Sequence, residues 1–414
     1  MAQHCLGVDF GTSNSAAGYL CDGTPRLIKV AAGQTTLPST FFFDFENRKT
    51  LMGEPANQAL LDGADGRFMR ALKRVLGTTL MHEKRQILNE RLTFVDIIAR
   101  FLQQIKIRAE VETGLTFDRV ISGRPVVFHA SNDPRELQAE ADLRACYLAA
   151  GFNEVDFILE PEAAAIASVA VDPSGGIGLI VDIGGGTSDF SMFRLENERV
   201  EILANHGVRI GGTDFDRAIN IDRVMPLLGK GTQLHKMMGP GSSPVPNAIF
   251  NDLATWEKIP FLYTPKNCRM VEEMARLSYD PEKLNRLVTV LEDELGHDLA
   301  FAVESGKIAA NIGGEQSRIA LDQIERRLSC ILTTEDLALI LAPMAQKLRA
   351  GAQETVQLAG LGAASVERVI YVGGSSLMSI VSETMKTQFP DARHSFTEVF
   401  TAVADGLAIA SARY

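Results

Sequence analysis

Two short stretches of the chain combine an aspartate with glycines and small hydroxyl residues. The first is Asp9–Ser15 (DFGTSNS) and the second is Asp182–Asp189 (DIGGGTSD). A turn of this composition exposes successive backbone N–H groups, which can cradle phosphate oxygens. A carboxylate approaches phosphate only through a cation, so an aspartate beside such a turn indicates a hydrated Mg²⁺ between the two.

Both stretches also allow a structural interpretation. An Asp-x-Gly-Thr turn occurs in ordinary hairpins with an Asx-type turn, and this alternative stays open for the first stretch taken alone. Three consecutive glycines at 184–186 lose conformational entropy without offering packing, so they indicate close approach of the backbone to a ligand. As a pair, the stretches predict one nucleotide held between two related halves. The sequence has no GxxxxGK[ST] pattern, so the phosphate site is not a Walker P-loop.

A third candidate is Val369–Ser376 (VIYVGGSS). An apolar strand that leads into Gly373 and Gly374 and then into a helix lets a flat ring or a phosphate approach the backbone. A simple tight turn is the alternative interpretation of this motif.

Apolar runs flank the first two loops and predict two hairpins, 6–10 with 16–20 and 177–183 with 190–193. Elsewhere the patterns predict helices over 67–77, 92–110, 134–150, 163–171, 281–311, 334–359 and 380–388, and strands over 119–122, 155–159 and 369–372. Residues 172–176 (DPSGG) are typical of a linker and mark a domain boundary. Residues 229–270 are rich in glycine and proline, contain the single tryptophan, and predict an irregular insertion.

Length and composition limit the class of protein. The chain has 414 residues, 46% apolar and 22% charged, which is typical of a globular protein with two or three domains. It shows neither a long apolar run nor a secretory leader, so we expect a cytoplasmic protein without a membrane partner. The net charge of −11 argues against nucleic acid as a partner. Five scattered cysteines without a CxxC pair indicate reduced thiols.

The three loops together resemble the nucleotide-binding domain of the seventy-kilodalton heat-shock chaperones (DnaK type), within the actin, hexokinase and heat-shock ATPase superfamily. Four further segments extend the resemblance over nearly the whole chain. They are the lysine-bearing segment 71–77 (ALKRVLG), the connecting motif 158–167 (ILEPEAAAIA), the GGEDFD-like motif 211–216 (GGTDFD) and the closing motif 402–406 (AVADG).

The resemblance implies a fold and a domain plan. The fold is α/β, a two-lobed actin-like ATPase fold with duplicated ribonuclease H-like domains and two inserted subdomains. Lobe I is expected over 1–172, with an inserted subdomain at about 38–117. Lobe II is expected over 173–395, with an enlarged inserted subdomain at about 212–332, and the helix in 396–414 is expected to return to lobe I.

The resemblance also implies an ATP or ADP site with Mg²⁺. Asp9 and Asp182 would hold the metal through water, Lys73 would offset charge at the γ-phosphate, and Glu160 would lie beside the attacking water. Thr187 joins Lys73, Glu160 and Asp182 as the expected catalytic set, in keeping with phosphoryl transfer by positioning and charge neutralisation. The expected nucleotide-binding residues are Gly11, Thr12, Ser13, Gly184, Gly185, Gly186, Thr187, Gly211, Gly212, Glu304, Lys307, Gly373, Gly374 and Ser375.

The chain departs from the family pattern at the adenosine side and at its end. Ile308 and Leu377 stand where the family has arginines, and Asn311 and Thr213 replace a serine and an acidic residue, so we expect weaker or altered nucleotide binding. The sequence ends at Tyr414, shortly after the closing motif. Together with the enlarged segment between Asp216 and Glu304, this predicts a member of the YegD-like group, which lacks the peptide-binding domain.

The predicted function is slow, Mg²⁺-dependent ATP hydrolysis by a chaperone-like protein. Its nucleotide state would change cleft closure and the binding of a protein partner, with residues 229–270 as the expected docking segment. Two alternatives from other classes remain. One is a small-molecule kinase on the same fold, and the other is a non-catalytic scaffold gated by nucleotide.

Overall fold

The computed structural model describes residues 4–31, 33–129, 133–171, 175–196, 199–236, 239–313, 317–396 and 401–413. Contacts divide the chain into two compact units. Unit 1 comprises Met1–Gly211, Leu348–Leu377 and Val381–Tyr414, and unit 2 comprises Gly212–Lys347 and Met378–Ile380. The linker predicted at 172–176 falls largely outside the described residues, and the division into lobes at 172 and 395 stays a prediction.

The first sheet of unit 1 begins with the predicted N-terminal hairpin. Its strands follow the order β11-β10-β1-β2-β3, and β4 pairs separately with β2. β1 is antiparallel to β2 and parallel to β10, which is parallel to β11. The strands are β1 (His4–Phe10), β2 (Asn14–Cys21), β3 (Thr24–Leu27), β4 (Thr36–Pro38), β10 (Phe117–Arg124) and β11 (Glu154–Leu159).

The second sheet of unit 1 repeats this plan. Its order is β14-β13-β12-β19-β20, with an antiparallel meander on one side of β12 and parallel strands on the other. The strands are β12 (Gly176–Ile183), β13 (Ser188–Glu196), β14 (Arg199–Val208), β19 (Arg368–Val372) and β20 (Arg393–Phe396). Both predicted hairpins are therefore confirmed, and each opens a five-strand path of the same topology.

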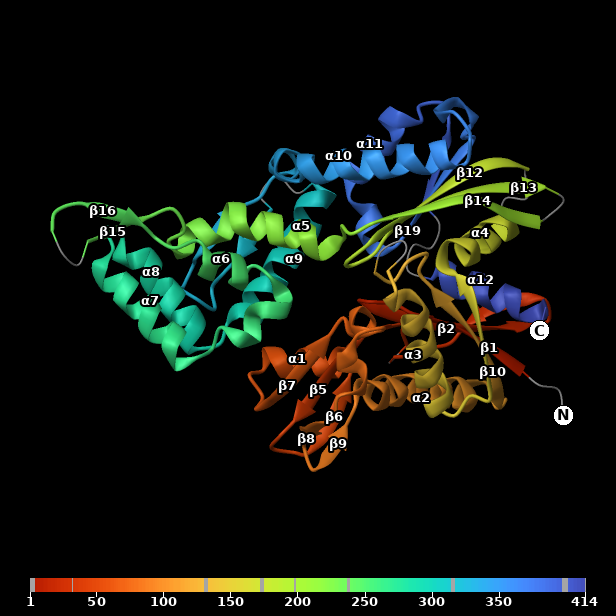
Figure 1. The fold of residues 1–414 in the computed structure, drawn as a ribbon, viewed down its shortest axis with the longest axis horizontal. Helices are drawn as coiled ribbons and strands as arrows, with labels where there is room; N and C mark the ends of the chain where they lie inside the picture. Colours follow the sequence, from red (N-terminus) through yellow and green to blue (C-terminus); the bar gives the residue numbers. More distant parts are fainter. Residues whose placement is uncertain are drawn as a thin grey trace. The chain divides into compact units, whose positions relative to one another are not determined.

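Helices close the two sheets around a shared core. α12 (Ala402–Ala410) lies beside β1, β2 and α4 (Glu160–Val171) (Figure 1). The approach is so close that a Cβ atom at Gly406 would overlap the Ala163 backbone, and one at Gly7 would meet Ala408 N at 2.8 Å. α3 (Arg135–Ala149), α10 (Thr334–Leu358), of which only 348–358 belongs to unit 1, and α11 (Ser379–Gln388) complete the helices predicted around the sheets.

A smaller subdomain of unit 1 carries the lysine-bearing segment. The three-stranded sheet β6-β5-β7, helix α1 and hairpin β8-β9 precede α2 (Phe94–Thr113), whose N-terminus is closed by a capping box of Thr93 and Asp96. The other elements are β5 (Thr40–Asp44), β6 (Lys49–Met52), α1 (Glu54–Leu61), β7 (Gly66–Arg70), β8 (Arg85–Ile87) and β9 (Glu90–Leu92).

The helix predicted over 67–77 is wrong. Residues 66–70 form β7, paired with β5, and only Leu72–Val75 turn as a short 3₁₀ helix. Ala71 has a φ of 59° and Gly77 a φ of 77°, and both values lie outside the right-handed helical region. The apolar spacing in this segment reflects strand and turn residues that face the same core.

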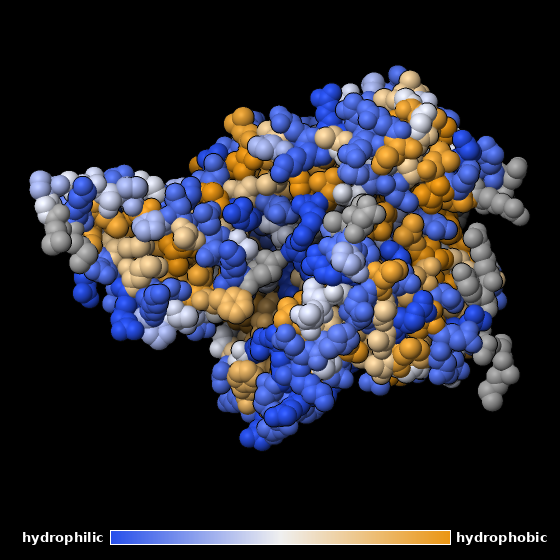
Figure 2. All heavy atoms as spheres, viewed as in Figure 1, coloured by the Kyte–Doolittle hydropathy of each residue, from blue (hydrophilic) through white to orange (hydrophobic). Residues whose placement is uncertain are grey.

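Unit 2 is mainly helical. α7 (Pro265–Leu277) and α8 (Pro281–Glu292) pack on each other, and Figure 2 shows hydrophilic residues beside hydrophobic ones over them. The helical run predicted over 281–311 is interrupted at 293–295, where α8 ends before α9 begins. Unit 2 also contains α5 (Gly212–Ile219), β15 (Gln233–His235), β16 (Ser242–Pro244), α6 (Ala248–Leu253), α9 (Gly296–Ile312), β17 (Arg318–Ala320) and β18 (Ser329–Ile331).

Residues 229–270 are more regular than the composition predicts. They contain the hairpin β15-β16, α6 and the start of α7. Ile249, Phe250 and Leu253 of α6 are buried, so part of the segment belongs to the core of unit 2. No helix among the described residues combines the length and the apolar character needed to cross a lipid bilayer.

Candidate functional site

The two Asp-headed loops meet in unit 1. A Cβ atom at Gly185 of the second loop would overlap Ser13 Oγ of the first. Within the first loop, a Cβ atom at Gly11 would overlap the Asn14 carbonyl. Within the second, Gly184 N–H donates to Thr187 O at 3.0 Å. Glycine is therefore required where the first loop bends and where the two loops touch.

Two further glycine motifs reach the second loop. A Cβ atom at Gly211 would overlap the backbone of Gly185 and Gly186. Gly373, with a φ of 78°, has its backbone so close to β12 that a Cβ atom would lie 2.6 Å from Asp182 Oδ1. The sequence predicted these four loops as parts of one site, and the structure places them together. Gly374 and Ser375 lie in the 3₁₀ turn that follows Gly373, and Gly212 begins α5 in unit 2.

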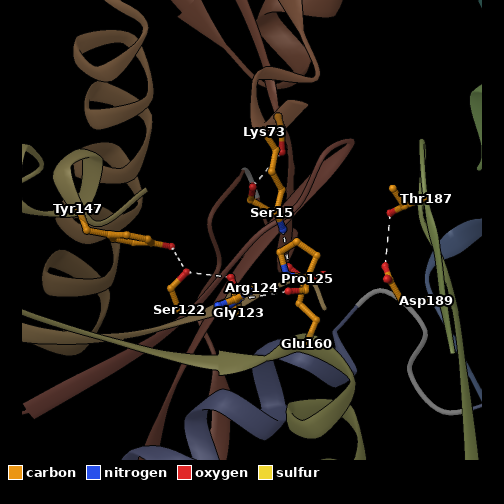
Figure 3. A network of polar contacts seen from close by, with 11 residues as sticks. Ser15, Lys73, Ser122, Gly123, Arg124, Pro125, Tyr147, Glu160, Thr187 and Asp189 are labelled. Atoms are coloured by element: carbon orange, nitrogen blue, oxygen red, sulfur yellow. Dashed lines mark hydrogen bonds and ion pairs between the residues drawn. The ribbon is translucent and has the colours of Figure 1, made fainter. Parts of the chain in front are cut away.

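Lys73 and Glu160 form a buried ion pair beside the loops. Their Nζ and Oε1 atoms are in direct contact, and their side chains are 7% and 14% exposed (Figure 3). Glu160 starts α4 and lies against β10, where a Cβ atom at Gly123 would be 3.1 Å from Glu160 Cγ. Lys73 comes from the 3₁₀ turn at 72–75. The pair joins two segments that are 87 residues apart in the sequence.

The carboxylates of the site outnumber the lysine that faces them. Burial, together with the charge of Glu160, raises the pKa of Asp9 and of Asp189 to about 7 in each case. Burial also raises the pKa of Asp182, with Glu160, Asp189 and Asp9 adding to the effect. Burial alone would lower the pKa of Lys73, but Glu160, Asp9 and Asp182 outweigh it and raise that pKa. Excess negative charge of this kind favours a bound cation.

The donor set fits a magnesium ion held through water. No group of three or more histidine, cysteine or acidic residues among the described ranges could hold a metal directly. Asp9 and Asp182 come from the ends of neighbouring loops, and Mg²⁺ keeps several of its waters when it binds one or two carboxylates and phosphates.

Asp189 was not predicted as a site residue. It lies opposite Asp182 in the β12-β13 register, is 4% exposed, and its Oδ2 accepts from Thr187 Oγ1 at 3.4 Å (Figure 3). Its Oδ1 is a buried oxygen without a hydrogen-bond partner among the described residues. The predicted hairpin could have identified Asp189, because a turn centred on 185–186 places residues 182 and 189 opposite each other.

Arg74 is a second residue that sequence reasoning missed. A Cβ atom at Gly186 would lie 3.2 Å from Arg74 Cζ, so the guanidinium covers the second loop. The segment at 72–75 therefore presents a lysine to the carboxylates and an arginine to the glycines. A Cβ atom at Gly185 would also lie 4.0 Å from Thr12 Cγ2 of the first loop.

The predicted adenosine residues Glu304 and Lys307 lie on α9, in unit 2. Lys307 is 6% exposed, and its Nζ pairs with Asp216 Oδ1 at 2.7 Å. On the same helix, Asn311 Oδ1 accepts from Ser379 N–H at 2.7 Å. Ile308 is 51% exposed. The motif 211–216 thus supplies the carboxylate that holds Lys307, and the contacts of Glu304 and Lys307 with a nucleotide remain predictions.

The sequence model of a protein family described as "Hsp70 protein" matches residues 5–227, just over half of the chain. The chain belongs to the Hsp70 family. The match covers three of the four glycine motifs, the Lys73 segment and Glu160. Membership confirms the resemblance found in the sequence and, with the two sheets of equal topology, the actin-like ATPase fold.

Similar curated Hsp70 proteins bear the name "Chaperone protein DnaK". The protein of Nitrosopumilus maritimus is 25% identical over 410 residues, which is 98% of this chain and 55% of that protein. The protein of Thermoplasma acidophilum is 35% identical over 221 residues, 52% of this chain and 34% of that protein. The protein of Metamycoplasma hominis is 31% identical over 220 residues, with 52% and 35% covered. The chain spans a third to about half of the length of these Hsp70 relatives.

Proposed function

We propose that this chain binds ATP or ADP with Mg²⁺ and hydrolyses ATP slowly, as a chaperone-like protein whose nucleotide state governs cleft closure and partner binding. The observation that carries the proposal is the meeting of four glycine motifs beside the Lys73–Glu160 pair and three carboxyls of raised pKa. The names of the DnaK relatives support the same class of function.

Each group has a role that its surroundings support. The backbone N–H groups of the two Asp-headed loops would bind phosphate oxygens, and Asp9 and Asp182 would hold Mg²⁺ through its waters. When bound, the ion would neutralise charge on the phosphates. Lys73 would place its ammonium at the γ-phosphate, because Glu160 fixes its direction. Glu160 and Asp189 would orient the attacking water and accept its proton.

The adenosine side is proposed to lie on α9. Glu304 would contact the ribose. Lys307 would contact the adenine after giving up part of its ion pair with Asp216. Ile308 offers an apolar surface where the family pattern has an arginine, so we expect weaker base stacking and lower affinity for ATP than in relatives with the arginine.

The test is phosphate release and nucleotide binding by the purified chain. Asp9→Asn and Lys73→Ala should each lower phosphate release about 10²-fold, the usual effect of removing one charge-stabilising group. Lys106→Ala, which removes a partly buried lysine paired with Glu110 on α2, is the matched control and should not change it. Equal rates in all four proteins would overturn the site, and ATP binding without release in the native chain would favour the scaffold.

A protein partner is proposed to dock on residues 229–270. Phe261 in this segment is 75% exposed. Deleting the whole segment would also remove the buried α6, so a point change is the sharper test. Phe261→Ser should weaken capture of the partner and leave phosphate release unchanged, and unchanged capture would argue against this surface.

A further inference from the structure

The segment that carries Lys73 is tied to α3 by a buried carboxylate. Asp142 Oδ2 accepts from Gly77 N–H at 2.8 Å, and Oδ1 accepts from Gln138 Nε2 at 2.7 Å. His82 Nε2 lies 3.1 Å from the same Oδ1, at the exposed side of the carboxylate. Asp142 is 1% exposed, so losing its side chain would leave the Gly77 amide buried without a partner.

A second contact holds the other polar group of the same peptide unit. His129 Nε2 lies 2.7 Å from Leu76 O, so the histidine donates to the carbonyl that precedes the Gly77 amide. His129 is itself held by α3, because its backbone N–H and that of Phe128 donate to Glu136 at 2.6 and 2.9 Å. Both polar groups of the Leu76–Gly77 peptide therefore depend on α3 and the loop before it.

Close packing confines this peptide further. Gly77 has a φ of 77°, and a Cβ atom there would lie 2.5 Å from Arg135 O and 3.1 Å from Ala139 Cβ. No side chain fits between the segment and α3 at this point. The peptide packs against the helix, and it is hydrogen-bonded to α3 through Asp142 and to the loop before α3 through His129.

Lys73 lies only one turn before this anchor. The 3₁₀ turn at 72–75 is only four residues long, and at its end Leu76 N–H reaches Lys73 O at a long 3.4 Å. A turn this short does not fix the direction of the Lys73 side chain unless its ends are held. The hydrogen bond from Gly77 to Asp142 lies four residues after Lys73 and holds this end of the turn.

We propose that Asp142, together with His129, is a positioning residue that clamps the Leu76–Gly77 peptide against α3 and so keeps the Lys73 ammonium on Glu160. The proposal rests on the proposed function only where Lys73 is assigned to ATP hydrolysis. The clamp itself is a property of the fold and is measured without nucleotide turnover.

The test compares Asp142→Ala, Asp142→Asn and His82→Ala in the full chain. One readout is the rate at which acetic acid N-hydroxysulfosuccinimide ester acetylates Lys73, followed by peptide mass spectrometry, because a buried lysine is protected. The other is phosphate release with ATP affinity from calorimetry. Asp142→Ala should raise Lys73 acetylation and lower kcat, each about tenfold or more, with the Kd for ATP nearly unchanged.

The two other variants separate the clamp from general damage. Asp142→Asn keeps an oxygen that accepts from Gly77, so it should restore most of the protection and of kcat. His82→Ala removes an exposed partner of the same carboxylate and should change neither readout. Protection and kcat that stay native in Asp142→Ala would overturn the proposal, and so would Asp142→Asn behaving like Asp142→Ala.

Two outcomes require a further variant or a second readout. Should Asp142→Ala fail to fold, His129→Ala tests the same peptide from the half-buried loop side, and native protection of Lys73 there overturns the clamp. Should the native chain show no phosphate release that depends on Lys73, the proposed function fails, and the acetylation rates alone still decide the clamp.

Discussion

Asp182 of β12 and Asp189 of β13 lie directly opposite each other across an antiparallel strand pair. Burial raises the pKa of both carboxyls, the like charge of Glu160 adds to the effect at both, and Asp9 adds to it at Asp182. Two aspartates in this relation are unfavourable in a site without cations, and they suit a site that takes one up. The following predictions start from that excess of negative charge.

Replacing Asp189 by asparagine should stabilise the nucleotide-free protein. The change removes a buried negative charge and keeps the shape. We expect the free energy of unfolding at pH 7.5 to rise by roughly 1–3 kcal/mol, because each unit of pKa shift corresponds to about 1.4 kcal/mol and relaxation recovers part of it. Urea denaturation measures this. Glu196→Gln on the same strand, at an exposed position, should change stability by less than about 0.5 kcal/mol. A loss of stability in Asp189→Asn would contradict the prediction.

The stability of the nucleotide-free protein should fall as the pH rises. Asp9 and Asp189 have a pKa of about 7 in the folded chain, against about 4 when unfolded, so the folded state binds more protons between these values. Their contribution is complete below pH 4 and is lost as the pH passes 7. The comparison is urea denaturation at pH 5.5, 6.5 and 7.5 for the native chain and Asp189→Asn. Equal slopes in the two proteins would argue against the raised pKa.

Magnesium alone should stabilise the chain more at pH 7.5 than at pH 5.5. The carboxyls of the site are ionised at the higher pH, and a cation bound to the folded state raises the melting temperature by mass action. Differential scanning fluorimetry with MgCl₂, against NaCl of equal ionic strength, measures the effect. Asp9→Asn should abolish most of it. A shift no larger than that of NaCl would show that the site does not bind the ion.

The two partners of the Lys73–Glu160 pair should not be equivalent. Lys73→Met leaves three aspartates and Glu160 without that cation, and breaking a buried pair in this way costs about 3–5 kcal/mol. Glu160→Gln leaves Lys73 attracted by Asp9 and Asp182, so its cost should be clearly smaller. Thermal and urea unfolding of both variants, and of the double variant, measure the difference. Equal losses of stability in Lys73→Met and Glu160→Gln would show that Asp9 and Asp182 do not stabilise the Lys73 ammonium.

Neighbouring glycines of the second loop should differ in their tolerance of a methyl group. A Cβ atom at Gly185 would overlap Ser13 Oγ, whereas the nearest atom to a Cβ at Gly184 is Thr187 O at 3.7 Å. Gly185→Ala should therefore lower the free energy of unfolding by about 1–3 kcal/mol, and Gly184→Ala should change it little. Adding Ser13→Gly to Gly185→Ala should restore stability. A double variant as unstable as Gly185→Ala would place the clash elsewhere.

Much of the site could be predicted from local sequence patterns. An apolar run, an aspartate and a glycine-rich turn define a strand end and its loop within about ten residues, so both hairpins and Gly373 were found. The pairing of Asp182 with Asp189 also follows from the hairpin register, although Asp189 was not among the predicted site residues. Periodicity failed at 67–77, because residues in a strand and a tight turn also return to one core at irregular intervals, and the left-handed Ala71 cannot be seen in the composition.

Sequence alone determined the types of residue and the loops that carry them, because these depend on bonds between near neighbours. Tertiary structure decided which of them meet. Glu160 reaches Lys73 across 87 residues, and Asp142 holds Gly77 from a separate helix. The raised pKa values of Asp9, Asp182 and Asp189 exist only because folding removes these carboxyls from water and brings like charges together, which no local pattern records.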